Sequence, residues 1–429
     1  MTDLQELFSC SSNLELLEQL QNSEPVMYRD NGNRAQEPAK YIEEIKEKLA
    51  LCGITRCGEI GQLAQHGYPV YQTTRPKLIY HTWYGQNSGS QGKGPTQDQA
   101  KISALMESVE AYCAEPRIPM LRRASYDDLS QSDLCVSPHA FTRRYQPREE
   151  APSLDEQLMW AKTLCIETQS EVYVPAESIF FPFIPRFYKT RSHFPCSSDG
   201  MASGSTYLEA VVHALYEKIE RHYLGLCQLG VAEQVPINVE GLSCYKDHEQ
   251  PEGEKTKAFA YLIPGIKNLP MIRVKSRSWG GMGCSATVDL SIIRAMSEAF
   301  QSEAIELSGS REDIAHQRAP QIFTKNSLSD GRKRKLEQPL SLSEYRASVV
   351  DEIFTDLRDE YNFLVNWIHE IGYPIICLAN LTRTGIGVPV VKTIIPGMLF
   401  QTQSAWSDDI KDSHKPHRIG YPSIRTANK

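Results

Sequence analysis

The sequence lacks any pair of cysteines spaced as in a zinc-binding or redox motif. Its 11 cysteines are scattered and odd in number, which argues against a full disulfide framework. The nearest two, Cys52 and Cys57, are not spaced as metal ligands, and the 11 histidines are equally dispersed. These absences exclude a recognisable zinc site. They predict free thiols in a reducing compartment, the cytoplasm.

Long apolar runs and an excess of basic residues are also absent. No run reaches the roughly 20 residues that cross a bilayer, and the acidic start of the chain is unlike a signal peptide. A net charge of −7 gives no electrostatic footprint for nucleic acid or for anionic membranes. The chain has 429 residues, 41% hydrophobic and 23% charged, which is the composition of an ordinary globular protein.

One short pattern occurs three times, each time on a predicted helix. Every copy reads Ala-(Leu/Met)-x-Glu-x-apolar-(Glu/Gln), so two polar side chains stand three residues apart and share a helix face. The polar pairs are Glu107 and Glu110, Glu217 and Glu220, and Glu298 and Gln301.

The second copy shows the pattern best. Because helix residues turn by about 100° each, Glu209, Glu217 and Glu220 fall within roughly 80° on one face. Apolar residues such as Leu215 take the opposite face and are predicted to be buried. An ordinary solvated face would explain any single copy, but such faces mix Lys with Glu, and only Arg221 borders this arc. Three cation-poor helices indicate a shared divalent-metal site, and carboxylates without Cys or His favour Mg²⁺ bound to phosphates.

Stretches rich in glycine and serine precede all three helices, at 88–96, 197–205 and 280–285, and we expect them to be loops. In the first, backbone N–H groups and Lys93 could cradle an anion. It is not a Walker A loop, because position 87 is not Gly and Gly94 follows the lysine. The third mimics a dinucleotide fingerprint, but no βαβ unit with a suitable acidic residue accompanies it.

Two histidines lie on the second glutamate helix. His222 projects to the apolar side and is predicted to be a hydrogen-bonded core residue. His213 lies on the acidic face, where a catalytic base and a structural role fit equally well. From the residues alone, the sequence predicts a Mg-nucleotide enzyme without a P-loop.

The rest of the chain alternates helical and strand-like segments, which predicts an α+β fold. We expect an N-terminal region at 1–70 and a catalytic domain at 71–429, with an exposed basic excursion at about 308–341. The segment 115–196 looks irregular, and its proline-broken run 179–185 should be an edge or loop. Helices are expected within 1–25 and at about 37–52, a loop at 26–37, and strands at 69–73, 78–83, 172–174, 375–378 and 388–395.

In their order and spacing, the three motifs resemble those of the YcaO family. The first runs from Lys93 to Glu110, the second from Gly200 to Arg221 and the third from Arg294 to Gln301. The match covers roughly 26–315 and, more loosely, the C-terminal strands. Segments 53–56 and 308–314, together with the one that holds Arg29 and Arg34, are most similar to the branch that works with TfuA-like proteins.

This resemblance implies a YcaO-type fold with a nucleotide site between the glutamate-bearing helices. It implies an ATP- and Mg²⁺-dependent enzyme that O-phosphorylates a backbone amide in a ribosomally made peptide (RiPP biosynthesis). The product would be a thioamide if external sulfur is added, or an azoline if a Cys, Ser or Thr side chain attacks. The TfuA likeness and the absence of a Pro-x-Pro-x-Pro tail favour the thioamide. A non-catalytic nucleotide-binding accessory is the alternative of another class.

The resemblance also implies partners and residue roles. A TfuA-like or leader-binding protein would deliver the precursor peptide, since no fused leader-binding domain is recognisable, and a homodimer is left open. No cysteine of this chain would be catalytic. Glu217, Glu220, Arg221 and Arg294 would be catalytic; Lys93, Ser103, Glu107, Ser205, Arg221, Arg294 and Gln301 would bind ATP; and Glu107, Glu110, Glu209, Glu217, Glu220 and Glu298 would hold Mg²⁺.

Overall fold

The computed structural model describes eleven stretches of the chain. They group into two compact units: one from 1–25, 110–225 and 356–429, the other from 26–109 and 226–355. Both mix helices and sheets, as the sequence predicted, and the predicted boundary at residue 70 stays a prediction. The described residues are 9–29, 32–64, 67–75, 89–117, 120–141, 152–239, 257–275, 279–309, 332–333, 338–400 and 424–425.

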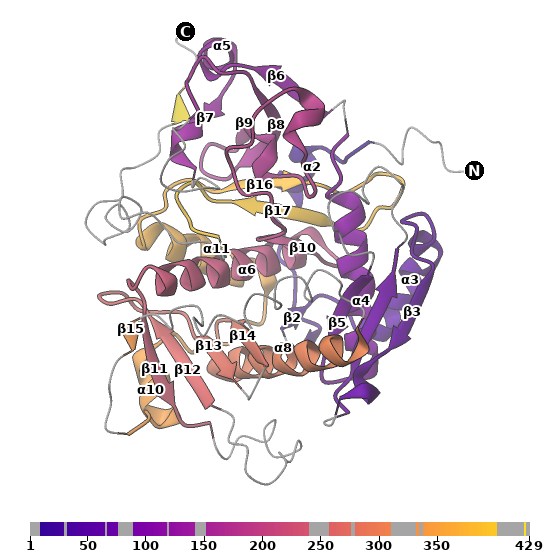
Figure 1. Ribbon diagram of the computed structural model, residues 1–429, viewed down its shortest axis with the longest axis vertical. Helices are drawn as coiled ribbons and strands as arrows, with labels where there is room; N and C mark the ends of the chain where they lie inside the picture. Colours follow the sequence, from indigo (N-terminus) through magenta and orange to yellow (C-terminus); the bar gives the residue numbers. More distant parts are fainter. Residues whose placement is uncertain are drawn as a thin grey trace. The chain divides into compact units, whose positions relative to one another are not determined.

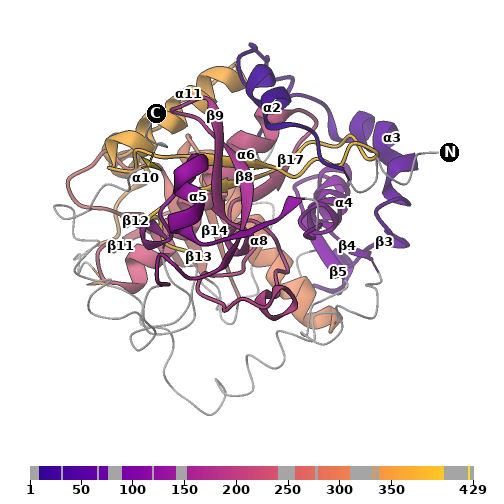
Figure 2. The same cartoon turned by 90° about the horizontal axis from the view of Figure 1, so that it is seen from above.

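The first unit is organised around an eight-stranded sheet. Its longest hairpin pairs β8 (Leu158–Cys165) with β9 (Ser170–Pro175), which run side by side in Figures 1 and 2. From β8 the sheet continues through β16 (Cys377–Asn380) and β17 (Val390–Ile394) to β10 (Met201–Ser203). From β9 it continues through β7 (Cys135–Val136) to β18 (Ile424–Arg425), and β6 (Arg122–Ala124) pairs with β8.

The prediction that 115–196 is mostly irregular is wrong. The segment holds β6, α5 (Tyr126–Ser132), β7, η4 (Pro138–Ala140), β8 and β9, and only the middle of β9 was predicted. Buried residues of β8 show little of the strict alternation by which a half-exposed strand is recognised. Its Trp160 packs in a cluster with Leu129 of α5 and with Phe194. The run 179–185 is a loop up to Ile184, as expected, and lies between η5 (Ala176–Ser178) and η6 (Pro185–Tyr188).

Helices α2 (Asn13–Gln19) and α11 (Leu357–Glu370) belong to the first unit, and α6 (Tyr207–Gln228) lies almost wholly in it. Leu215 of α6 is fully buried, as predicted. The acidic face is no solvated surface, because Glu209 and Glu220 are only 7% and 4% exposed. His222 is confirmed as a satisfied core residue: Leu399 N–H donates to its Nδ1, and its Nε2 lies 3.0 Å from the Tyr373 hydroxyl.

The second unit contains a five-stranded and a three-stranded sheet. Helix α8 (Val288–Ser308) runs across β14 and β13 of the larger sheet, as Figure 1 shows. The larger sheet has the order β14 (Gly280–Cys284), β13 (Met271–Lys275), β12 (Lys257–Leu262), β11 (Glu233–Ile237) and β15 (Arg332–Lys333). The smaller sheet joins β3 (Arg56–Glu59), β4 (Val70–Thr74) and β5 (Gly89–Lys93). The unit also holds α3 (Pro38–Leu49), η1 (Gly61–Leu63), α10 (Leu342–Ser348) and most of α4 (Gln97–Cys113).

Several expected elements are confirmed: the helices near 13–19 and 37–52, and the strands near 69–73, 172–174, 375–378 and 388–395. The expected loop at 26–37 contains a short hairpin, β1 (Tyr28–Arg29) paired with β2 (Asn33–Arg34). The expected strand at 78–83 and most of 308–341 lie outside the described residues. No helix in the described part is long and apolar enough to span a bilayer, and its ten cysteines are free thiols.

The three glycine- and serine-rich stretches are not simply loops: β5 and β14 take up most of the first and third, and the second contains the short strand β10. In β5 and β14 glycine is needed because the following helix packs closely on its own strand. A Cβ on Gly92 would lie 1.9 Å from Ala104 N, and one on Gly283 would lie 2.1 Å from Ser291 O. A threonine then caps each helix by accepting the N–H three residues on, at 3.2–3.3 Å. These threonines are Thr96, Thr206 and Thr287.

Candidate active site

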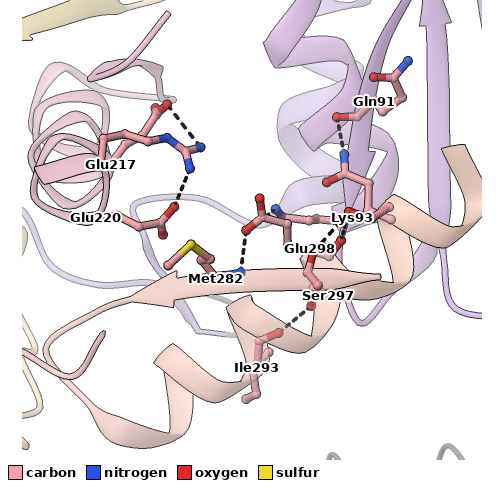
Figure 3. Close-up of polar contacts among 12 residues, drawn as sticks. Gln91, Lys93, Glu217, Glu220, Met282, Ile293, Ser297 and Glu298 are labelled. Carbon is pink, nitrogen blue, oxygen red and sulfur yellow. Dashed lines mark hydrogen bonds and ion pairs between the residues drawn. The ribbon is translucent and has the colours of Figure 1, made fainter. Parts of the chain in front are cut away.

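In the second unit, two glutamate helices attach their carboxylates to their own strands in the same way. Gln91 N–H donates to Glu107 at 2.8 Å, and Met282 N–H donates to Glu298 at 2.8 Å. The second of these bonds is drawn in Figure 3. In both cases the donor lies five residues before the capping threonine and the acceptor eleven after it. The strand thus holds one oxygen of each carboxylate in place.

Lys93 and Gln301 complete this group. Lys93 Nζ lies 3.8 Å from Glu298, and Gln301 Nε2 donates to Gln91 O at 2.9 Å. These contacts join β5 to α8 within the unit. Arg294 lies one turn before Glu298 on the same helix face, so the group carries cations as well as carboxylates. Such a mixture suits a ligand with both phosphate and metal.

In the first unit, a single arginine lies among three carboxylates. Arg221 Nη1 is 3.1 Å from Glu220, Nη2 is 3.9 Å from Glu217, and Nε is 3.8 Å from Asp199. Figure 3 shows Glu217 and Glu220 and draws their ion pairs with this arginine. Burial raises the pKa of Glu217 to about 8 despite the attraction of Arg221, and Asp199 and Glu110 add to the rise. Without a bound cation, Glu217 is therefore mostly protonated at neutral pH.

Glu217 occupies the position of Glu107 and Glu298 in the pattern but lacks their backbone bond. The corresponding donor, Met201 N–H, bonds to Ser198 O at 2.9 Å instead. A carboxylate without such a donor is poorly stabilised in its charged form, which is consistent with the raised pKa.

Serines hold the remaining two carboxylates of the first unit. Ser203 donates to Glu110 through its N–H at 2.8 Å and its hydroxyl at 2.6 Å. Ser205 donates to Glu209 at 2.6 Å. Ser205 was predicted to bind ATP, which stays a prediction, and its hydroxyl holds a predicted metal ligand. Ser203 was not predicted at all.

Sequence analysis also missed three charged residues beside this group. Asp199 contacts Arg221, while two buried lysines donate to backbone carbonyls: Lys218 to Leu399 O at 3.1 Å and Lys392 to a carbonyl of the stretch before β10. Burial lowers the pKa of both lysines, that of Lys392 to about 8. The signal was present, because Lys392 is the one charge in an apolar strand.

The predicted site residues are divided between the two units. Among the described residues, no three Cys, His, Asp or Glu side chains converge into a finished metal cage. The donors nevertheless fit Mg²⁺, since they are carboxylate oxygens, and a cation would relieve the unfavourable charge of Glu217. The first unit holds Glu110, Ser205, Glu209, Glu217, Glu220 and Arg221, and the second holds Lys93, Ser103, Glu107, Arg294, Glu298 and Gln301.

A family model described as YcaO cyclodehydratase, ATP- and Mg²⁺-binding, matches residues 91–399. The chain belongs to the YcaO family. Members of this family are ATP-dependent peptide-modifying enzymes. The match confirms the predicted family and the predicted cofactors, ATP and Mg²⁺. All three YcaO motifs recognised in the sequence fall within the matched residues.

Relatives and a solved structure agree with this assignment. An uncharacterized protein of Methanothermobacter thermautotrophicus is 26% identical over 393 residues, 85% of this chain and 94% of that protein. An "uncharacterized protein in tfuA 3′ region" of Rhizobium leguminosarum bv. trifolii is 28% identical over 397 residues, 86% and 89% of the two chains. The location of this relative beside tfuA is consistent with the predicted TfuA-associated branch. YcaO from Methanopyrus kandleri bound with AMPPCP and Mg²⁺ superposes with a TM-score of 0.67 at 21% identity, covering 87% and 94%. This match confirms the YcaO-type α+β fold.

Proposed function

We propose that this YcaO protein uses Mg-ATP to convert a backbone amide of a ribosomally made peptide into a thioamide, with a TfuA-like partner and an external sulfur donor. The observation that carries the proposal is that each unit holds carboxylates in place beside a cation, which is Arg221 in the first unit and Lys93 in the second. The relative named for its place beside tfuA supports the choice of partner.

The proposed reaction balances as follows. Hydrosulfide adds to the amide carbon, and the resulting oxyanion attacks the γ-phosphorus of ATP, so that an O–P bond forms and ADP leaves. The C–O bond then breaks, phosphate departs and the C=S bond remains. The net change is amide, hydrosulfide and ATP to thioamide, ADP and phosphate.

Catalysis of such a transfer is mainly positioning and charge neutralisation. Mg²⁺, when bound, neutralises phosphate charge. In this proposal Glu107, Glu110, Glu209, Glu217, Glu220 and Glu298 hold the metal. Arg221, Arg294 and Lys93 bind phosphate oxygens, while Ser103, Ser205 and Gln301 complete the nucleotide site.

Two other functions compete with this one. An azoline-forming cyclodehydratase would use the same site with a Cys, Ser or Thr side chain of the peptide as nucleophile, and the family description favours it. A non-catalytic accessory would bind nucleotide without turnover. The held carboxylates argue against the accessory, because nucleotide binding alone does not require them all.

Mass spectrometry of a precursor peptide incubated with the protein, Mg-ATP, sulfide and the TfuA-like partner separates these functions. A thioamide exchanges oxygen for sulfur, an azoline loses water, and an accessory leaves the peptide unchanged. We expect oxygen-to-sulfur exchange that requires the partner. Water loss without added sulfur would overturn the thioamide assignment.

The site assignment has its own test. Glu217→Gln and Glu220→Gln should each abolish both ATP hydrolysis and peptide modification while the protein stays folded. Leu215→Ala, on the buried side of the same helix, should instead cost about 2–5 kcal/mol of stability. Wild-type turnover in either glutamine variant would contradict the assignment.

A further inference from the structure

Two buried cysteines of the first unit face each other across neighbouring strands. Cys165 ends β8, Cys377 begins β16, and the two residues are paired in antiparallel register. Both side chains are fully buried, and both thiols are free. Residues paired in this way direct their side chains to the same face of a sheet. The two sulfur atoms therefore lie on one side of the sheet, and neither cysteine is among the predicted site residues.

The register places this pair at a position where a disulfide fits. Ile166 N–H donates to Ile376 O at 3.0 Å, so Ile166 and Ile376 form a hydrogen-bonded pair. Hydrogen-bonded and non-hydrogen-bonded pairs alternate along an antiparallel ladder, which makes Cys165 and Cys377 a non-hydrogen-bonded pair. The Cα atoms of such a pair are about 4.5 Å apart, within the range of roughly 4.4–6.8 Å that a disulfide spans. The strands need not slide or separate for the bond to form.

The surroundings of the two thiols make them unequal. A hydrogen bond from the Cys377 thiol lowers the pKa of Cys165, although burial opposes this, whereas the same bond and burial together raise the pKa of Cys377. Cys165 Sγ also donates to a Glu167 carboxylate oxygen at 3.3 Å, which gives its proton an acceptor. The thiolate is the reactive form of cysteine, so Cys165 is the sulfur that reacts first and Cys377 the one that resolves the product.

The pair lies close to the surface despite its burial. Glu167, which contacts Cys165, has a side chain that is 23% exposed, and its partner His369 is 34% exposed. Because β8 ends at Cys165 and β16 begins at Cys377, local opening of the strand ends admits a small oxidant. Hydrogen peroxide is such an oxidant.

The two cysteines also lie at a narrow junction of the eight-stranded sheet. Two residue pairs join β8 to β16, whereas six join β8 to β9 and four join β16 to β17. Beyond this junction lie β17, which carries Lys392, and β10, whose Ser203 holds Glu110. A covalent bond at the junction would tie these strands to the β8–β9 hairpin, whose position beside β16 is seen in Figure 1.

We propose that Cys165 and Cys377 are a redox-sensitive pair that hydrogen peroxide converts into a disulfide between β8 and β16. The Cys165 sulfur attacks one peroxide oxygen, which gives a sulfenic acid and water. The Cys377 sulfur then attacks the Cys165 sulfur, so that the S–S bond forms and a second water leaves. The peroxide gains the two electrons that the thiols lose, and a dithiol reverses the bond by exchange, becoming a disulfide itself. The bond stabilises the first unit because it restricts the unfolded chain.

The test uses the full chain, treated with hydrogen peroxide under native conditions. The remaining thiols are then blocked by alkylation, and the protein is digested without reductant. Mass spectrometry should find the peptides of Cys165 and Cys377 linked, with a mass two hydrogens below their sum. The melting temperature of the oxidised protein should rise by at least about 3 °C and return to its starting value after treatment with dithiothreitol.

Three serine variants identify the cysteines responsible. Cys165→Ser and Cys377→Ser should show no rise in melting temperature after peroxide. Cys135→Ser is the matched control, because Cys135 is fully buried in β7 of the same sheet but is paired with Tyr173 and Arg425. This variant should respond as the wild type does. Melts of the untreated variants establish that each is folded, and the peptide map of the wild type needs no variant.

Three results would overturn the proposal. The first is a peptide map in which Cys165 and Cys377 stay reduced at a peroxide concentration that oxidises the partly exposed Cys57. The second is oxidation of Cys165 to a sulfinic acid, or its linkage to another cysteine, in place of the bond to Cys377. The third is a Cys165–Cys377 bond that leaves the melting temperature unchanged, since the staple would then stabilise nothing.

Discussion

Three glutamates occupy the same position, eleven residues after a capping threonine, yet their surroundings differ. Glu107 and Glu298 accept a strand N–H, whereas Glu217 has Arg221 at 3.9 Å as its counter-charge. The shared position was predicted from the sequence, because helix periodicity alone determines it. The difference in surroundings was not predicted, because it depends on where the Met201 N–H points in the folded chain.

Glu217→Gln should therefore stabilise the metal-free protein at high pH. The folded-state pKa of Glu217 is about 8, above its ordinary 4.5, so its ionisation costs stability. That cost is absent when the pH is below the ordinary pKa of 4.5, and it grows as the pH rises. It is complete when the pH is above the folded-state pKa of about 8. Since one pKa unit corresponds to about 1.4 kcal/mol, denaturant titrations should show a gain of at least that size at about pH 9 and little gain near pH 5.

Glu298→Gln is the matched control for this prediction. It removes a carboxylate from the same pattern position but also weakens the bond from Met282 N–H. We expect no gain in stability for this variant at any pH. Equal gains for both variants would mean that burial of Glu217 is not the cause.

At the scale of elements, the sequence predicted the three glutamate helices better than the strand that precedes each of them. The three glutamate helices have clear patterns, but β5, β10 and β14 were mistaken for loops. Glycine is depleted in strands on average, and in β5 and β14 it permits the close approach of a helix residue eight to twelve positions downstream, Ala104 at Gly92 and Ser291 at Gly283. That approach is a tertiary contact, which local sequence does not record.

The close approach of α8 to β14 predicts a specific sensitivity. Gly283→Ala places a Cβ 2.1 Å from Ser291 O, so the helix must shift away from its strand. We expect a loss of about 1–3 kcal/mol in the free energy of unfolding, typical of overpacking. Gly280→Ala on the same strand meets only Val274 O, at 3.2 Å, and should cost clearly less. Similar losses in urea titrations of both variants would contradict this packing argument.

At the scale of the whole molecule, the order of motifs was predictable and the division into units was not. Each unit is assembled from stretches distant in sequence, and the units change within α4 and α6. The charges of Asp199 and Lys392 were missed for a related reason. They join the site through folding of the first unit rather than through the helix pattern.

ATP and Mg²⁺ should stabilise the protein together rather than separately. A ligand at a hundred times its dissociation constant adds about 2.7 kcal/mol of stability. Thermal melts with ATP alone, with Mg²⁺ alone and with both should show the large shift only in the last case. A shift with ATP that magnesium does not increase would contradict metal binding by the carboxylates.

Binding of Mg-ATP should also release a proton. At pH 7 Glu217, with a pKa of about 8, is mostly protonated, and a carboxylate must lose its proton to bind a metal. The released proton should appear as a dependence of the binding enthalpy on the ionisation enthalpy of the buffer, and affinity should rise as the pH approaches 8. Lys392 titrates in the same range, so wild type must be compared with Glu217→Gln, which should release less. Equal proton release by the two proteins would show that Glu217 is not the group that loses its proton when the nucleotide binds.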